Sequence, residues 1–175
     1  MREIPLGKGA IKHTGRVALV DDNDYAGLMK YRWYASLRNR KDKYHAIRTV
    51  AVGSKTHGTF KNNTIPMARQ ILEAPSDSFI LHLNGNTLDC TRKNMKAVTR
   101  RQYAALQPPR PGGTSKYKGV VWVPSKNRWR AIITDLLDSR YLGSYKKEKE
   151  AARAYDAAAL ALFGEYAYLN FPKKR

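Results

Sequence analysis

The chain has 175 residues, enough for one medium-sized domain or two small ones with separate cores. Its 33 Lys and Arg against 14 Asp and Glu give a net charge of +19, and a hydrophobic content of 42% excludes wholesale disorder. The excess of positive charge lies on both sides of Arg110, with a net of +12 up to that residue and +7 beyond it. This distribution predicts a long polyanion, a nucleic acid, as the partner.

Membrane binding and disulfides are not expected. No apolar run approaches transmembrane length, and no basic amphipathic helix shows a broad apolar face. Cys90 is the only cysteine, which excludes an internal disulfide and a zinc knuckle. The first residues, MREIPLGKGA, lack the hydrophobic region of a signal peptide, so we expect a cytoplasmic protein.

Short strands and helices are expected over the first hundred residues. Alternating or apolar runs bounded by turn residues predict strands, and capping residues or a first-turn proline predict helices. In chain order the predicted elements are a strand over Arg16–Val20, a helix capped by Asp21 and Asp22 that runs to about Met29, a hairpin of Tyr31–Leu37 and Lys43–Val50, a strand near Thr59 and Phe60, a helix over Pro66–Leu72, a strand over Phe79–Leu83, and a helical stretch from about Asp89 that includes Asn94.

A tether divides the chain. The segment QPPRPGGTS, Gln107–Ser115, contains the prolines and glycines of a semi-flexible linker, so we expect domains over 1–106 and 116–175 with a linker over 107–115. Beyond it, three short strands are predicted over Tyr117–Val123, Arg128–Thr134 and Arg140–Tyr145. A helix over about Lys147–Phe163 carries one apolar stripe and ends at Gly164, so it must cover one face of the sheet.

The other face of this sheet is a candidate DNA-binding surface. Alternation along the second strand directs Trp129, Ala131 and Ile133 towards the helix and sends Arg128 and Arg130 to the open face. A small sheet fits a major groove, where guanidinium groups pair with guanine edges or phosphates. The alternative is a solvated face above core tryptophans. The residues expected beside the two arginines are Lys118, Trp122, Arg140 and Tyr141.

The second half of the chain resembles the apetala-two/ethylene-response-factor DNA-binding domain. The resemblance covers Ser115–Pro172 and rests on SKYKGVVW, NRWRAII and YLGSYKKEKEAARAYDAAALALFGEYAYLNFP. It implies a three-stranded antiparallel sheet in the major groove with the helix packed behind it. Val121 and Thr134 stand where plant members often place base-contacting arginines, so the target sequence is expected to differ from theirs.

The first half resembles the HNH homing endonucleases of phages, in the architecture that joins an HNH module to the same DNA-binding domain. The matching segments are IPLGKG, GRVALVDDNDYAGLMKYRWYA, IPMARQIL and LHLNGNTLDCTRKNMKAVTRRQ. The resemblance implies an α+β chain whose N-terminal module has the ββα-metal fold. It makes His82 the general base, Asn94 a metal ligand, and Asn84, Gly85 and Asn86 the turn between them.

Three departures from the HNH pattern predict that this site is vestigial. Leu81 stands in place of the anionic metal ligand, Ala68 in place of a histidine and Cys90 in place of an asparagine. A hard dication binds oxygen, and losing one charge at about 4 Å removes roughly 4 kcal/mol of attraction at an effective dielectric near 20. We therefore expect no cofactor, with Mg²⁺ or Mn²⁺ required only if the nuclease is active. Rescue by Asp77 or Asp89 is the less favoured alternative.

A second set of basic residues follows the turn at Asn84, Gly85 and Asn86. Beside a nuclease-like cleft they would contact phosphates, although a solvated helix face is the alternative. They are Arg92, Lys93, Lys96, Arg100 and Arg101.

Together these features predict a sequence-specific double-stranded DNA-binding protein, derived from an HNH homing endonuclease, that acts by occupancy, for example as a transcriptional repressor. An active nicking or cleaving HNH endonuclease is the main alternative, and a protein that blocks an active relative at its target is a third. The phage resemblance implies the cytoplasm of a bacterial host cell.

Overall fold

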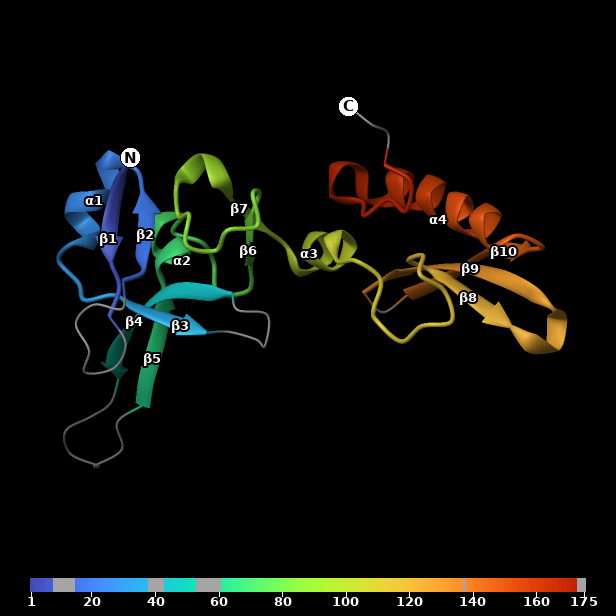
Figure 1. Ribbon diagram of the computed structural model, residues 1–175, viewed down its shortest axis with the longest axis horizontal. Helices are drawn as coiled ribbons and strands as arrows, with labels where there is room; N and C mark the ends of the chain where they lie inside the picture. The colour runs from blue at the N-terminus through green and yellow to red at the C-terminus, as the bar shows by residue number, and fades with distance from the viewer. Residues whose placement is uncertain (8–14, 38–42, 53–60, 137, 173–175) are drawn as a thin grey trace. The chain divides into compact units, whose positions relative to one another are not determined.

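The computed structural model describes residues 1–7, 15–37, 43–52, 61–136 and 138–172. The chain divides into two compact units, Met1–Val98 and Thr99–Arg175. Both combine short helices with antiparallel sheets, which confirms the predicted α+β class (Figure 1).

The N-terminal unit contains three small antiparallel sheets in its described residues. Their orders are β1–β2, β3–β4–β5 and β6–β7. The elements are β1 (Arg2–Pro5), β2 (Val17–Val20), α1 (Asp22–Leu28), β3 (Tyr34–Leu37), β4 (Tyr44–Val52), β5 (Lys61–Pro66), α2 (Met67–Ile71), β6 (Phe79–His82), the 3-10 turn η1 (Arg92–Asn94) and β7 (Met95–Val98).

One hydrophobic core joins these sheets and helices. It is built from apolar side chains that alternate along β1 and β2, such as Ile4 and Val20, together with Met67 and Ile71 from the inner side of α2. The predicted strand at β2, the hairpin β3–β4 and the helix α2 are therefore confirmed within a few residues, whereas β1 was not predicted. The strand expected near Thr59 and Phe60 lies outside the described residues.

The helix expected from Asp89 is wrong. The backbone of Leu19 in β2 exchanges hydrogen bonds with the 88–90 segment, at 2.9 Å to the Leu88 oxygen and 2.8 Å from the Cys90 nitrogen. This extended contact holds the segment out of helical geometry. The chain makes only the short turn η1 and returns as β7, which pairs antiparallel with β6. The described structure thus contains the β6–β7 hairpin but no α-helix between Leu83 and Val98, so the predicted ββα arrangement is not seen there.

The C-terminal unit is a three-stranded antiparallel sheet with a helix on one face, as predicted (Figure 1). The strand order is β10–β9–β8, and the elements are α3 (Arg100–Leu106), β8 (Val120–Val123), the turn η2 (Pro124–Lys126), β9 (Arg128–Asp135), β10 (Asp138–Tyr145), α4 (Glu148–Phe163) and η3 (Gly164–Tyr166). Small side chains allow α4 to approach the sheet closely, since Ala151, Ala152 and Ala159 are fully buried. Gly164 ends the helix with a positive φ of 55°.

Helix α3 belongs to the C-terminal unit, whereas the sequence analysis assigned all residues up to 106 to the first domain. A capping box starts the helix: Thr99 Oγ1 accepts from the Gln102 nitrogen, and the Gln102 side chain accepts from the Thr99 nitrogen. Ala105 is buried and its carbonyl accepts a hydrogen bond of 3.2 Å from the Tyr168 nitrogen. These contacts place the division of the chain between Val98 and Thr99, ahead of the proline-rich segment.

Gly119, just before β8, is required by space as well as by conformation. Its φ is +74°, and a Cβ there would collide with the Tyr155 ring and lie 2.6 Å from the Ile132 carbonyl oxygen. We expect Gly119→Ala to lower the free energy of unfolding of this unit by about 2–4 kcal/mol, because backbone strain and overpacking add.

Gly112→Ala is the matched control. Its φ is +85°, but nothing lies within 4 Å of the added Cβ, so only the conformational cost of about 1 kcal/mol is expected. Urea unfolding of the two variants measures the difference, and equal losses would show that the contact with Tyr155 does not constrain the fold.

Candidate nucleic-acid interface

The strand register decides which side chains lie on the open face of the C-terminal sheet. Residues directly opposite each other in an antiparallel pair share a face. Val120 pairs with Ala131, and both are buried beneath α4. Val121 pairs with Arg130 on the opposite side, and both are exposed. Alternation along β8 and β9, and the pairing of β10 with β9, assign the remaining positions.

The open face combines guanidinium groups, hydroxyls and apolar side chains. Arg128, Arg130 and Tyr141 lie there, as predicted, and Tyr141 is 64% exposed. Val121 and Thr134, the positions expected to differ from plant members of the resembled family, also lie there. The remaining members of the open face are Val123, Ile132, Ser139 and Ser144.

Sequence reasoning missed these four residues, and for Ser144 the reason is that β10 does not alternate regularly. The pairing with β9 shifts between Tyr141 and Gly143, so that Leu142 and Gly143 both fall on the helix side. Alternation continued from Tyr141 without this bulge misplaces Ser144. For Ile132, the alternation that located Arg128 and Arg130 would have been enough.

Two residues predicted on the open face lie on the other side of the sheet. Trp122 pairs with Trp129, and the two rings are 4.9 Å apart. Arg140 pairs with Ile133, which is 2% exposed beneath α4, and its guanidinium lies 3.4 Å from the Asp138 carboxylate. The predicted placement of Trp122 and Arg140 was therefore wrong, because apolar pattern and charge do not fix the register of neighbouring strands.

Lys118 has a structural position that the prediction missed. Its ammonium group donates to the carbonyl oxygens of Ala104, Ala105 and Gln107 at 3.2, 2.6 and 2.6 Å, and so caps the C-terminus of α3. Burial lowers the pKa of Lys118 to about 8, which leaves the group mostly charged near neutral pH. A cation held in this way is not available to the open face.

Asp156 and Asn170 fix the chain segments around Lys118. The Asp156 carboxylate accepts hydrogen bonds of 2.8 Å from the backbone nitrogens of Asn170 and Phe171. The Asn170 amide in turn bonds both the backbone nitrogen and oxygen of Lys118, at 2.7 and 3.1 Å. Asp156 in α4 and Asn170 therefore hold the segment before β8 and the C-terminal segment against the helix.

Two members of the second basic set are neutralised by carboxylates. Arg92 forms a bidentate pair with Asp24, at 2.9 and 2.7 Å, and its backbone nitrogen donates to Asp21. Arg101 forms another bidentate pair, at 2.7 Å in both bonds, with Asp135. Each pair raises the pKa of its arginine through the hydrogen bonds it makes. Lys93 and Arg100 are exposed, and Lys96 is partly buried in β7.

Asp21 consequently does not cap α1 through its side chain, contrary to expectation. It stands at the N-cap position, but its carboxylate accepts a hydrogen bond from the backbone nitrogen of Arg92 instead. The acidic residues of the first turn, Asp22 and Asp24, still complement the helix dipole.

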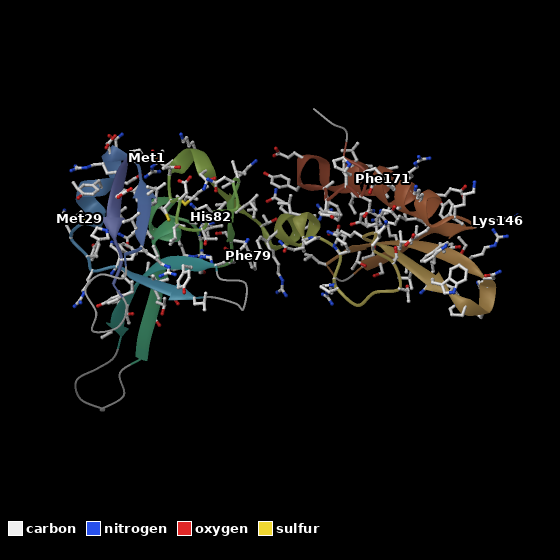
Figure 2. All side chains as sticks on the ribbon, in the orientation of Figure 1. Met1, Met29, Phe79, His82, Lys146 and Phe171 are labelled. Carbon is white, nitrogen blue, oxygen red and sulfur yellow. The ribbon has the colours of Figure 1, made fainter. Side chains whose placement is uncertain are left out.

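His82, labelled in Figure 2, is the last residue of β6. Its Nε2 atom is buried and has no hydrogen-bond partner among the described residues. The His45 ring lies edge-on at 6.5 Å between centroids. Burial first, and then the electrostatic interaction with His45, lower the pKa of His82 to about 4, so its imidazole is neutral at pH 7.

Asn94 uses both ends of its side-chain amide inside the β6–β7 loop. The oxygen accepts from the Asn84 nitrogen at 2.9 Å, and the nitrogen donates to the Asp89 carbonyl at 2.8 Å. The Asp89 carboxylate accepts from Thr91 and from the Asn84 amide. Asn94 is 6% exposed, as expected of a residue that holds the loop in shape.

The residues present do not fit a divalent cation. Leu81 supplies no oxygen ligand, and Ala68 and Cys90 are packed in the hydrophobic core at 7% and 1% exposure. The oxygens of Asp89 and Asn94 are committed to the loop, and a hard cation requires several free oxygens. Within the described ranges, no three His, Cys, Asp or Glu side chains gather as a metal site.

Comparison with known proteins identifies the C-terminal unit. Residues 115–165 match the family model of the AP2 domain. The C-terminal unit contains an AP2 domain. This module binds double-stranded DNA sequence-specifically and is characteristic of transcription factors, in agreement with the sheet and helix described above.

The relatives are plant proteins. Over 186 residues the chain is 30% identical to the ethylene-responsive transcription factor WRI1 of Arabidopsis thaliana, covering 95% of this chain and 42% of that protein. It is 44% identical over 59 residues to the AP2-like ethylene-responsive transcription factor At1g79700 of Arabidopsis thaliana, covering 34% and 19%. It is 48% identical over 77 residues to the AP2/ERF and B3 domain-containing protein Os01g0141000 of Oryza sativa subsp. japonica, covering 44% and 20%. The chain thus spans less than half the length of each.

These relatives correct one prediction and leave another untested. The cytoplasm of a bacterial host cell is wrong, because the relatives are eukaryotic proteins and two of them are named as transcription factors. The HNH resemblance predicted for residues 1–106 receives no support from them and stays a prediction. No helix among the described residues has the length and apolarity needed to cross a bilayer.

The neutral state of His82 predicts a pH-dependent stability. The unfolded chain binds a proton at the ordinary pKa of 6.5, whereas the folded chain does so only at about 4. The free energy of unfolding should therefore fall as pH is lowered from 6.5 towards 4. A partly solvated side chain contributes less than the full shift implies, so we expect a loss on the order of 1–2 kcal/mol.

Urea unfolding at pH 7 and pH 4.5, for the natural chain and for His82→Leu, isolates this contribution. The carboxylates that titrate in the same range are common to both proteins and cancel in the difference. The same pH dependence in both proteins would contradict the expectation.

Proposed function

We propose that this protein binds one double-stranded DNA sequence through the open face of its AP2 domain and acts by occupying that site, for example to repress transcription. The observation that carries the proposal is the position of Arg128 and Arg130. Both are exposed on the face opposite the one that α4 covers, and neither guanidinium group forms an ion pair or hydrogen bond with the described part of the chain. Unpaired guanidinium groups on a small sheet suit guanine edges in a major groove.

The N-terminal unit is proposed as a degenerate HNH module that adds backbone contacts. The hairpin β6–β7, with His82 at its end and the Asn84–Asn94 hydrogen bond across its loop, supports this origin. The lack of suitable oxygen ligands supports the loss of cleavage, so we propose that no metal cofactor is needed. Lys93 is exposed and suited to a phosphate contact. Two linked contacts on one duplex raise the effective concentration of the second.

Binding should depend on Arg130 far more than on Arg140. A duplex enriched from a randomised pool serves as the probe, and fluorescence anisotropy without divalent metal measures affinity. Arg130→Ala should weaken binding by about 1–3 kcal/mol, since a bidentate contact to a base is lost. Arg140→Ala is the matched control, because this arginine lies on the α4 side and should cost little. Similar losses for both variants would indicate nonspecific attraction instead of recognition by the open face.

A metal-dependent nuclease is the second candidate, and one observation favours it. His82 is neutral at pH 7, the state that a general base requires. Under our proposal, the natural protein leaves supercoiled plasmid intact in millimolar Mg²⁺ or Mn²⁺. Leu81→Asp should raise metal affinity by up to about a thousandfold, because roughly 4 kcal/mol of attraction is restored.

Leu81→Asn separates the effect of charge from that of size. It is nearly isosteric with the aspartate variant and should not gain metal affinity to the same extent, as measured by calorimetric titration with Mn²⁺. Nicking by the natural protein that His82→Ala abolishes would establish the nuclease and overturn action by occupancy.

A further inference from the structure

The open face of the AP2 domain contains an apolar strip beside its arginines. Val121 is 39% exposed and pairs with Arg130, which in turn pairs with Ser144 across β9 and β10. Ile132 is half-buried and pairs with Tyr141. Two apolar side chains therefore lie next to Arg130 on the open face. Val121 is directly opposite it on β8, and Ile132 is two residues further along β9.

Only one base carries an apolar group on its major-groove edge. Thymine presents the C5-methyl group, whereas the other bases present hydrogen-bond donors and acceptors at the positions that proteins read. Guanine offers two acceptors to a guanidinium group. An arginine flanked by aliphatic side chains thus matches a guanine with a thymine nearby.

The spacing of the sheet limits how far apart these bases can lie. Residues two apart on one face of a strand are separated by about 6.8 Å, roughly the rise of two base pairs. If Arg130 contacts a guanine, Ile132 reaches bases about two steps away along the groove. Val121, directly opposite Arg130, is displaced across the sheet by about 5 Å and reaches an adjacent step.

The hydroxyls on this face are already partly engaged. The Tyr141 hydroxyl donates a hydrogen bond of 2.9 Å to Ser144 Oγ, and the hydroxyl oxygens of Thr134 and Ser139 share one of 3.0 Å. These internal bonds leave the aliphatic side chains of the face as the groups whose burial requires an apolar counterpart, and two of them, Val121 and Ile132, lie beside Arg130.

We infer that the AP2 domain of this protein recognises thymine C5-methyl groups through Val121 and Ile132, within about two base pairs of a guanine read by Arg130. This inference rests on the proposed DNA-binding function and specifies the substrate as duplexes with this thymine–guanine arrangement. Removing one methyl contact costs about 0.8 kcal/mol, which corresponds to about a fourfold loss of affinity.

Replacing thymine with uracil tests the inference without changing base pairing. The full chain first enriches duplexes from a randomised thymine-containing pool, and the enriched duplex is then remade with uracil at one thymine at a time. We expect one or two positions near a conserved guanine of the enriched set to lose about fourfold in affinity. Val121→Ala should bind the thymine duplex more weakly and remove the thymine–uracil difference at one of these positions.

Thr134→Ala is the matched control, because it changes the same face but leaves the aliphatic groups in place. It should keep the full thymine–uracil difference. Equal binding of all uracil duplexes, or a Val121→Ala protein that keeps the difference at every position, overturns the inference while DNA binding stands. Failure to enrich any duplex overturns the proposed function, and this inference with it.

Discussion

The packing of α4 on one face of the β8–β9–β10 sheet determines what the other face can do. The small side chains of Ala151, Ala152 and Ala159 bring the helix close to the sheet. It buries Val120, Ala131 and Ile133, so the side chains on that face of each strand belong to the core. The side chains on the opposite face, including Arg128 and Arg130, are not covered by the helix. Recognition chemistry in this unit is therefore a consequence of apolar packing on the reverse side of the same strands.

The large positive charge of the chain is not equivalent to a DNA-binding surface. Arg92 and Arg101 are neutralised by Asp24 and Asp135, and Lys118 caps α3. These cations stabilise the two units themselves, which reduces the number available to phosphates or bases. Net charge predicts the class of partner correctly, but the location of contact depends on which cations lack an internal partner.

The N-terminal unit shows how polar residues of a suspected catalytic loop can be structural. Asn84, Asp89 and Asn94 satisfy one another and the loop backbone, while Ala68 and Cys90 fill the core. His82 differs from them, since its buried Nε2 has no partner among the described groups. An orphaned imidazole atom in an otherwise satisfied loop is consistent with a residue whose original role was chemical, which is why we retain the HNH origin as a proposal.

The sequence by itself determined the α+β class, the three-stranded sheet with its covering helix, and the DNA-binding character of the C-terminal unit, because periodicity and charge are properties of local segments. It also located Arg128 and Arg130, which needed only the alternation of one strand. The tertiary structure alone decided the positions of Trp122, Arg140 and Lys118. Register, the bulge after Tyr141 and the capping of α3 depend on residues distant in sequence, and no local pattern records such pairings. The false helix at Asp89 has the same cause, since pairing with Leu19 keeps that segment extended.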